Sequence, residues 1–281
     1  MLELVQEIFA YQFLSRAAIT GSILSVCAAL LGVNLVLKRY SMIGDGLSHL
    51  SFGALAVAMS LGLAPYWVAV PLVILSSFLL LRISARASIR GDAALAMLSA
   101  AALSIGIIAV SLGQGLSADV YNYMFGSILT TSPAEVKGIV VFGLVVLVVY
   151  VFSYHAFFAL SFDETFAAAS GLNVGLYNAL LAILSSCTVV LGMRLMGALL
   201  ISALLIFPPL SAMRLAKSYR KVTILAIIFA LIAFWLGFLA SYHFSTPSGA
   251  SVVVANLILY CLAWAFSKIR KSASYRQVRN A

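Results

Sequence analysis

Apolar stretches recur from one end of this 281-residue sequence to the other, with only short polar segments between them. A helix needs about 20 apolar residues to cross a hydrocarbon core about 30 Å thick, and most of these stretches reach that length. Only 9% of the residues are charged, which excludes an ordinary soluble domain. We therefore expect an all-α, polytopic integral membrane protein with about eight or nine transmembrane helices. No room remains for a soluble domain, so residues 1–281 are expected to form a single transmembrane domain.

The seventh apolar stretch is the least regular. It is short, rich in glycine and alanine, and closed by Pro208 and Pro209, which favours a broken or tilted helix. The number of crossings is odd unless this stretch is re-entrant. The predicted spans are 13–37, 44–63, 66–82, 93–112, 136–157, 175–193, 196–212, 222–242 and 249–267.

Basic residues between the spans predict the orientation in the membrane. The net charge of +9 is concentrated in four segments, which lie on the same side if the chain alternates across the bilayer. Lys and Arg are retained on the cytoplasmic side, so the N-terminus is expected outside and the basic tail 268–281 inside. The charge therefore indicates orientation in membrane lipid and not a nucleic-acid partner. The four segments are 38–43, 82–92, 214–221 and 268–281.

Two connections are longer than simple turns. The outer one, 113–135, carries several aromatic residues and is expected to contain a short helix across the outer mouth. The inner one, 158–174, is expected to form a small cytoplasmic helix. Asp163 and Glu164 would lie in its first turn, where the helix dipole favours acids, and Gly171 would end it.

Asp45 and His49 are the leading candidates for a metal site, because ionisable groups inside a membrane are costly and usually functional. Their spacing of four residues places both side chains on one helix face, and a carboxylate with an imidazole suits Zn²⁺ or Mn²⁺. One pair supplies two ligands of about four, so two copies of the chain are the natural setting. The alternative is a helix cap beside a hydrogen-bonded core histidine. Gly46 and Gly53 are expected to allow close helix packing.

The remaining candidates are weaker. His243, at the outer mouth, is either an entry contact for a cation or an ordinary surface histidine. The three cysteines lack CxxC spacing, which argues against a thiolate site. The sequence contains no phosphate-binding G-x-x-x-x-G-K-[ST] loop, no HExxH and no G-x-S-x-G, so we expect no ATP hydrolysis and no hydrolase activity in this chain.

A set of motifs in order along nearly the whole chain resembles the membrane permeases of bacterial zinc and manganese ABC importers. The most specific are the D-x-x-x-H of Asp45 and His49 and the run that closes with Pro208 and Pro209. The matching segments are LKRYSMIGDGLSHLSFGALA, FGSIL, FDETFAAASGLNV, MGALLISALLIFPPLSA and TPSGASVVVANL.

The resemblance implies a type II ABC importer-like permease of the bacterial cytoplasmic membrane that works as a homodimer. Asp45 and His49 of both subunits would form a site for the transported zinc or manganese ion, with no permanently bound cofactor. The helix around Asp163, Glu164, Ala168 and Gly171 would dock on a separate ATPase subunit that binds ATP. An extracytoplasmic metal-binding protein would deliver the ion.

One position departs from the family pattern. Relatives often carry an acid just before the TPSG turn, where this chain has Ser245, and His243 is a possible substitute. An ion-gradient-driven secondary metal carrier without an ATPase partner remains the alternative, although no internal repeat typical of such carriers is evident. The residues do not choose between zinc and manganese.

Overall fold

The computed structural model describes residues 11–86, 91–112, 126 and 132–279. Every regular element in those ranges is a helix, as lipid requires, because a helix satisfies its backbone polar groups within its own segment. The helices are α2 (Gln12–Leu37), α3 (Ser41–Ser60), α4 (Pro65–Arg86), α5 (Gly91–Leu112), α7 (Pro133–Phe152), α8 (Tyr154–Phe162), α9 (Glu164–Ala169), α10 (Val174–Met196), α11 (Ala198–Leu215), α12 (Tyr219–Phe244) and α13 (Ser248–Arg279).

Among the described residues, eight helices are long and apolar enough to cross a membrane. The predicted span 66–82 falls in α4, whose described apolar part is the shorter segment Trp67–Leu79. The prediction of an all-α membrane protein with eight or nine crossings is therefore confirmed. The outer segment predicted to contain a short helix lies outside the described residues, except for Gly126 and residues 132–135.

One detail of the predicted spans is wrong. The fifth span does not run to residue 157, because α7 ends at Phe152, with Ser153 as its C-cap, and α8 starts anew at Tyr154. The seventh was predicted to be broken or tilted, and the break is excluded because α11 continues through Pro208 and Pro209. Proline at 209 removes the amide that would bond the carbonyl of Leu205. That carbonyl lies against Gly32 of α2, where a Cβ would come within 2.1 Å of its oxygen, so a neighbouring helix covers the exposed group.

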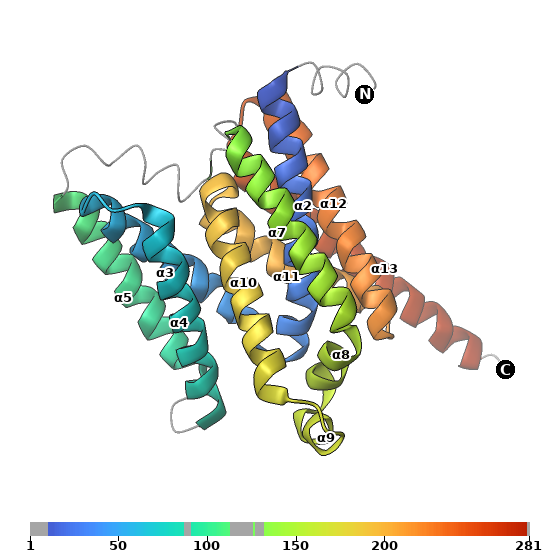
Figure 1. The fold of residues 1–281 in the computed structure, drawn as a ribbon. Coiled ribbons are helices and arrows are strands. Elements are labelled where there is room, and N and C mark those ends of the chain that lie inside the picture. Colours follow the sequence, from blue (N-terminus) through green and yellow to red (C-terminus); the bar gives the residue numbers. More distant parts are fainter. Residues whose placement is uncertain (1–10, 87–90, 113–125, 127–131, 280–281) are drawn as a thin grey trace.

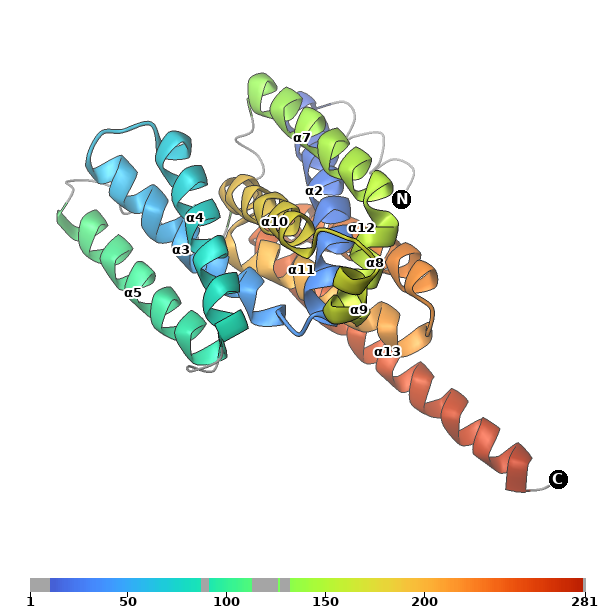
Figure 2. The same ribbon diagram turned by 60° about the horizontal axis from the view of Figure 1, so that its bottom comes forward.

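Helices α3, α4 and α5 pack together on one side of the molecule, and α7, α12 and α13 lie on the other (Figures 1 and 2). Helix α11 is central, with contacts to α2, α3, α10, α12 and α13. The start of α2 and the short helix α9 lie at opposite ends of the bundle (Figure 1). A single residue, Gly197, separates α10 from α11, with φ of 85°.

Small residues bring α3 and α5 into close contact. A Cβ on Gly53 would lie 2.4 Å from the carbonyl oxygen of Ala102, and one on Gly106 would lie 2.9 Å from the Cα of Gly53. A Cβ on Gly46 would lie 2.7 Å from the side chain of Leu95. The predicted packing function of Gly46 and Gly53 is confirmed. Close approach of this kind drives helix association in lipid, where burial of apolar surface contributes little.

We predict that Gly53→Ala destabilises the protein by about 1–3 kcal/mol, because the added methyl group meets backbone and forces α3 and α5 apart. The measurement is thermal unfolding of the purified chain in detergent. Gly138→Ala on α7 is the matched control, since a Cβ there meets nothing within 4 Å. Equal melting temperatures for the two variants would contradict the packing argument.

Candidate metal site and cytoplasmic helix

Asp45 and His49 lie one turn apart in the first half of α3. The Nε2 atom of His49 is 3.6 Å from Oδ2 of Asp45, and the two side chains are 28% and 44% exposed respectively. This separation is within ion-pair range but exceeds that of a good hydrogen bond. The structure therefore brings the two predicted ligands together on one face of α3.

The face of α3 that carries the pair is open in the single chain. Gly44 faces Leu205 of α11, and Gly46 faces Leu95 of α5. Since successive residues of a helix are 100° apart, Asp45 points between those two neighbours and away from the core. Met42, one turn earlier, is exposed on the same face. Asp45 lies inside α3 and does not cap it, because the N-cap is Tyr40, which excludes the cap alternative.

The pair is an incomplete metal site by itself. In the part of the chain that the structure describes, no group of three or more His, Cys, Asp or Glu side chains gathers. A closed zinc site has about four ligands. His243 therefore does not join Asp45 and His49 within one chain.

His243 lies in the last turn of α12, exposed, with its ring 4.9 Å from that of Phe244. Beside it, Ser245 ends the helix with φ of 51°. A hollow of about 490 Å³ opens here, and its polar lining consists of hydroxyl and backbone groups. It is lined by Phe13, Leu14, Gly126, Phe238, Ser241, Tyr242, Ser245, Thr246, Pro247 and Ser248.

The predicted cytoplasmic helix is α9, preceded by the end of α8. Asp163 is its N-cap and accepts hydrogen bonds from the amides of Thr165 at 2.9 Å and Phe166 at 3.0 Å. The Thr165 hydroxyl donates to the same oxygen. These hydrogen bonds hold the pKa of Asp163 below its usual value, and the bond from the Thr165 hydroxyl has the largest effect. Gly171 follows the helix with φ of 87°, and its amide donates to the carbonyl of Ala168 at 3.1 Å.

One face of this segment is open. Asp163, Glu164, Ala168 and Gly171 are all exposed, whereas Ala167 is buried against the bundle. Two large apolar side chains, Phe162 and Phe166, are exposed as well. An exposed apolar patch of this kind is typical of a protein interface.

Lys38 was expected only as an inside-facing basic residue, but its side chain is buried. It is 5% exposed and lies 2.6 Å from Glu164, which is 45% exposed. Lys38 also donates to Oδ1 of Asn178, whose amide donates to Glu164 at 3.4 Å. Tyr40 lies between α2 and α3, and its pKa is raised mainly by burial and further by the negative charge of Glu164. The positions of Lys38 and Asn178, 140 residues apart, gave no sequence signal for this cluster.

A second polar cluster links four helices. Oδ1 of Asn34 on α2 accepts from the hydroxyl of Tyr219 at 2.8 Å and from that of Ser161 at 3.0 Å. The hydroxyls of Tyr219 and Tyr150 are 2.9 Å apart. Helices α2, α7, α8 and α12 are therefore linked by groups that satisfy one another out of water.

The sequence model of the ABC 3 transport family matches residues 10–267. The chain belongs to this family. Among its relatives, the manganese import system permease protein ScaB of Streptococcus gordonii is 29% identical over 262 residues, covering 93% of this chain and 94% of that protein. The high-affinity zinc uptake system membrane protein ZnuB of Haemophilus influenzae is 28% identical over 253 residues, covering 90% and 97% respectively.

A solved structure gives the same result for the fold. PsaBC from Streptococcus pneumoniae, in complex with Fab, contains a chain that is 26% identical to this one. The two superpose with a TM-score of 0.85 over 96% of this chain and 99% of the other. Membership of the ABC 3 family supports an ABC importer and not an ion-gradient-driven carrier. This chain is the transport subunit and not an enzyme, as the sequence predicted.

We predict that Asp163→Ala loosens α9, because the amides of Thr165 and Phe166 lose their acceptor. Hydrogen exchange of these amides should become several-fold faster, whereas Asp163→Asn, which keeps an acceptor oxygen, should stay close to the wild type. Because the pKa is lowered on folding, the ionised group stabilises the folded state above its usual value near 3.8. That contribution is lost as the pH falls through the lower, folded value. Equal exchange in both variants would contradict the cap.

Proposed function

We propose that this chain is the permease subunit of an ATP-driven importer that moves zinc or manganese through a site shared by two copies of the chain. The observation that carries the proposal is the Asp45–His49 pair on the open face of α3. A dehydrated cation needs fixed negative or lone-pair partners. A partly exposed carboxylate and imidazole, one turn apart and without a hydrogen bond between them, supply them.

Two copies complete the ligand set. In a twofold dimer the same patch of both subunits meets, so each contributes one Asp45 and one His49. Four ligands of this type suit Zn²⁺ and also Mn²⁺. The ion is the substrate and must be released, so a site assembled from two movable subunits fits transport better than a closed cage. ScaB is named for manganese and ZnuB for zinc, so both ions remain candidates.

The cytoplasmic segment 158–174 is the proposed docking element for the ATPase subunit, which would bind and hydrolyse ATP. Its support is the exposed patch of Phe162 and Phe166 beside Asp163, Glu164, Ala168 and Gly171. This assignment places the start of α2 outside and the tail 268–281 inside the bacterial cytoplasmic membrane. The hollow beside Ser245 then faces outwards, where an extracytoplasmic metal-binding protein would deliver the ion, with His243 as a secondary contact.

We predict that Asp45→Ala and His49→Ala each reduce metal uptake by more than about tenfold, because the site loses two of its four ligands in the dimer. The measurement is uptake of radioactive zinc and manganese by cells that express the chain with its cognate ATPase, corrected for the amount of permease in the membrane. His155→Ala is the control, since His155 is an exposed histidine on α8. Wild-type uptake by both ligand variants would overturn the proposal.

The shared site can be tested separately by cross-linking. In a chain whose Cys27, Cys187 and Cys261 are replaced, Met42→Cys should form a disulfide-linked dimer in membranes, because Met42 is exposed on the face of α3 that carries Asp45. Val151→Cys is the matched control, exposed near the inner end of α7 on the other side of the molecule. Cross-linking at residue 151 without cross-linking at residue 42 would exclude the α3 face as the interface.

A further inference from the structure

The cluster of Lys38, Glu164 and Asn178 lies apart from the metal ligands, and the proposed docking surface accounts only for the exposed Glu164. Its central group is an ammonium ion whose side chain is 5% exposed. Its two partners come from α9 and α10, and the ring of Tyr40 lies 5.8 Å from Nζ. The cluster therefore joins the docking helix to the connection between α2 and α3.

That connection is short and held at each residue. Lys38 follows the last residue of α2, and α3 begins three residues later at Ser41. Arg39 has φ of 61°, and the amide of Tyr40 donates to the carbonyl of Leu35 at 2.7 Å. With no slack in the connection, a displacement of Lys38 changes where α3 starts. Asp45 follows within two helical turns.

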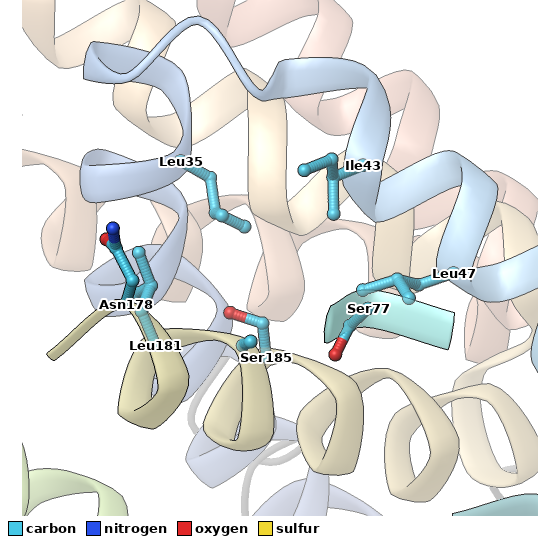
Figure 3. A pocket seen from close by; sticks show the side chains of 8 residues that line it. Leu35, Ile43, Leu47, Ser77, Asn178, Leu181 and Ser185 are labelled. Atoms are coloured by element: carbon cyan, nitrogen blue, oxygen red, sulfur yellow. The ribbon is translucent and has the colours of Figure 1, made fainter. Parts of the chain in front are cut away.

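The first part of α3 borders a small cavity. Figure 3 shows this cavity between α2, α3, α4 and α10, with Ile43 and Leu47 of α3 on one side and Ser185 of α10 on the other. Its volume is about 10 Å³, close to the space that one water molecule needs. The Ser185 hydroxyl is buried without a hydrogen-bond partner among the described groups. Asn178 lines the same cavity and also binds Lys38, so the cluster and the cavity are continuous.

We propose that Lys38 is a positioning residue that transmits movement of α9 to α3 and so to Asp45 and His49. The inference rests on the proposed function, in which α9 docks on the ATPase and α3 carries the metal. Lys38 does not touch the ion. It acts through the short connection to α3 and, by way of Asn178, through the cavity wall that Ile43 and Leu47 share.

The difference in burial explains why Lys38 follows Glu164. Glu164 is half exposed and can be hydrated if the pair opens, whereas the Lys38 ammonium would lose its counter-charge in a low-dielectric interior and keep only the neutral Asn178 as a partner. Leaving a buried charge unpaired is much more costly than exposing its partner. When α9 moves with the ATPase, keeping the Lys38–Glu164 ion pair costs less free energy than breaking it, so Lys38 moves with α9.

The test is a comparison of coupling in the assembled transporter, reconstituted in liposomes with its cognate ATPase. Lys38→Met removes the charge and keeps the apolar stem, and Glu164 can be solvated in that variant. We expect ATP hydrolysis to stay near the wild-type rate, while zinc or manganese moved per ATP hydrolysed falls about tenfold. Glu164→Gln should lower the metal moved per ATP to a similar extent, although its place in the docking surface can also change the rate of ATP hydrolysis. The double variant should be no worse than either single change, because one interaction is removed in all three.

Lys217→Met is the matched control, since Lys217 is an exposed lysine between α11 and α12, and it should leave the transport-to-ATP ratio unchanged. A wild-type ratio in Lys38→Met would overturn the inference. A parallel loss of melting temperature and ATP hydrolysis would also overturn it, because Lys38 would then be only structural. Wild-type transport by Asp45→Ala would instead overturn the proposed metal site, on which the inference rests.

Discussion

The need to satisfy backbone polar groups without water governs most of this structure. In the described residues the chain meets it with helices alone, and even the two prolines of α11 do not interrupt the pattern. The carbonyl of Leu205 lies against a glycine of α2, so the helix packing covers a defect that would otherwise be exposed to lipid. Glycine serves similarly between α3 and α5, where it allows the backbones to approach. The bundle is therefore held by close backbone packing as much as by large side chains.

Because ionisable groups are so few in this bundle, each described one has a distinct structural position. Lys38 is paired and buried, and it joins α9 and α10 to the connection between α2 and α3. Asp45 and His49 are only partly buried and share no hydrogen bond, and they lie on the open face of α3. In the proposed mechanism a single subunit therefore contains the Lys38 connection and half of the metal-binding site.

Much of this could be predicted from the sequence, because the predictable parts depend on local patterns. The spans follow from runs of apolar residues, the proximity of Asp45 and His49 from a spacing of four, and α9 from two acids expected in its first turn and a closing glycine. What the sequence left open has mainly tertiary causes. The continuity of α11 through its prolines depends on α2, whose Gly32 covers the Leu205 carbonyl. The burial of Lys38 depends on Glu164 and Asn178, which are distant in sequence. From the sequence alone, Lys38 therefore resembled the other basic residues between spans, which indicate only orientation in the membrane.

The one-residue link at Gly197 has a consequence for how such a bundle can change shape. Its positive φ is strained for any residue with a side chain, and Gly126 packs so closely on it that a Cβ there would lie 2.2 Å from the carbonyl carbon of Met196. No spare chain exists beyond this one residue, so a change in the angle between α10 and α11 has to occur at Gly197 itself. Without such a change, any rearrangement of the bundle moves the two helices together as one angled unit.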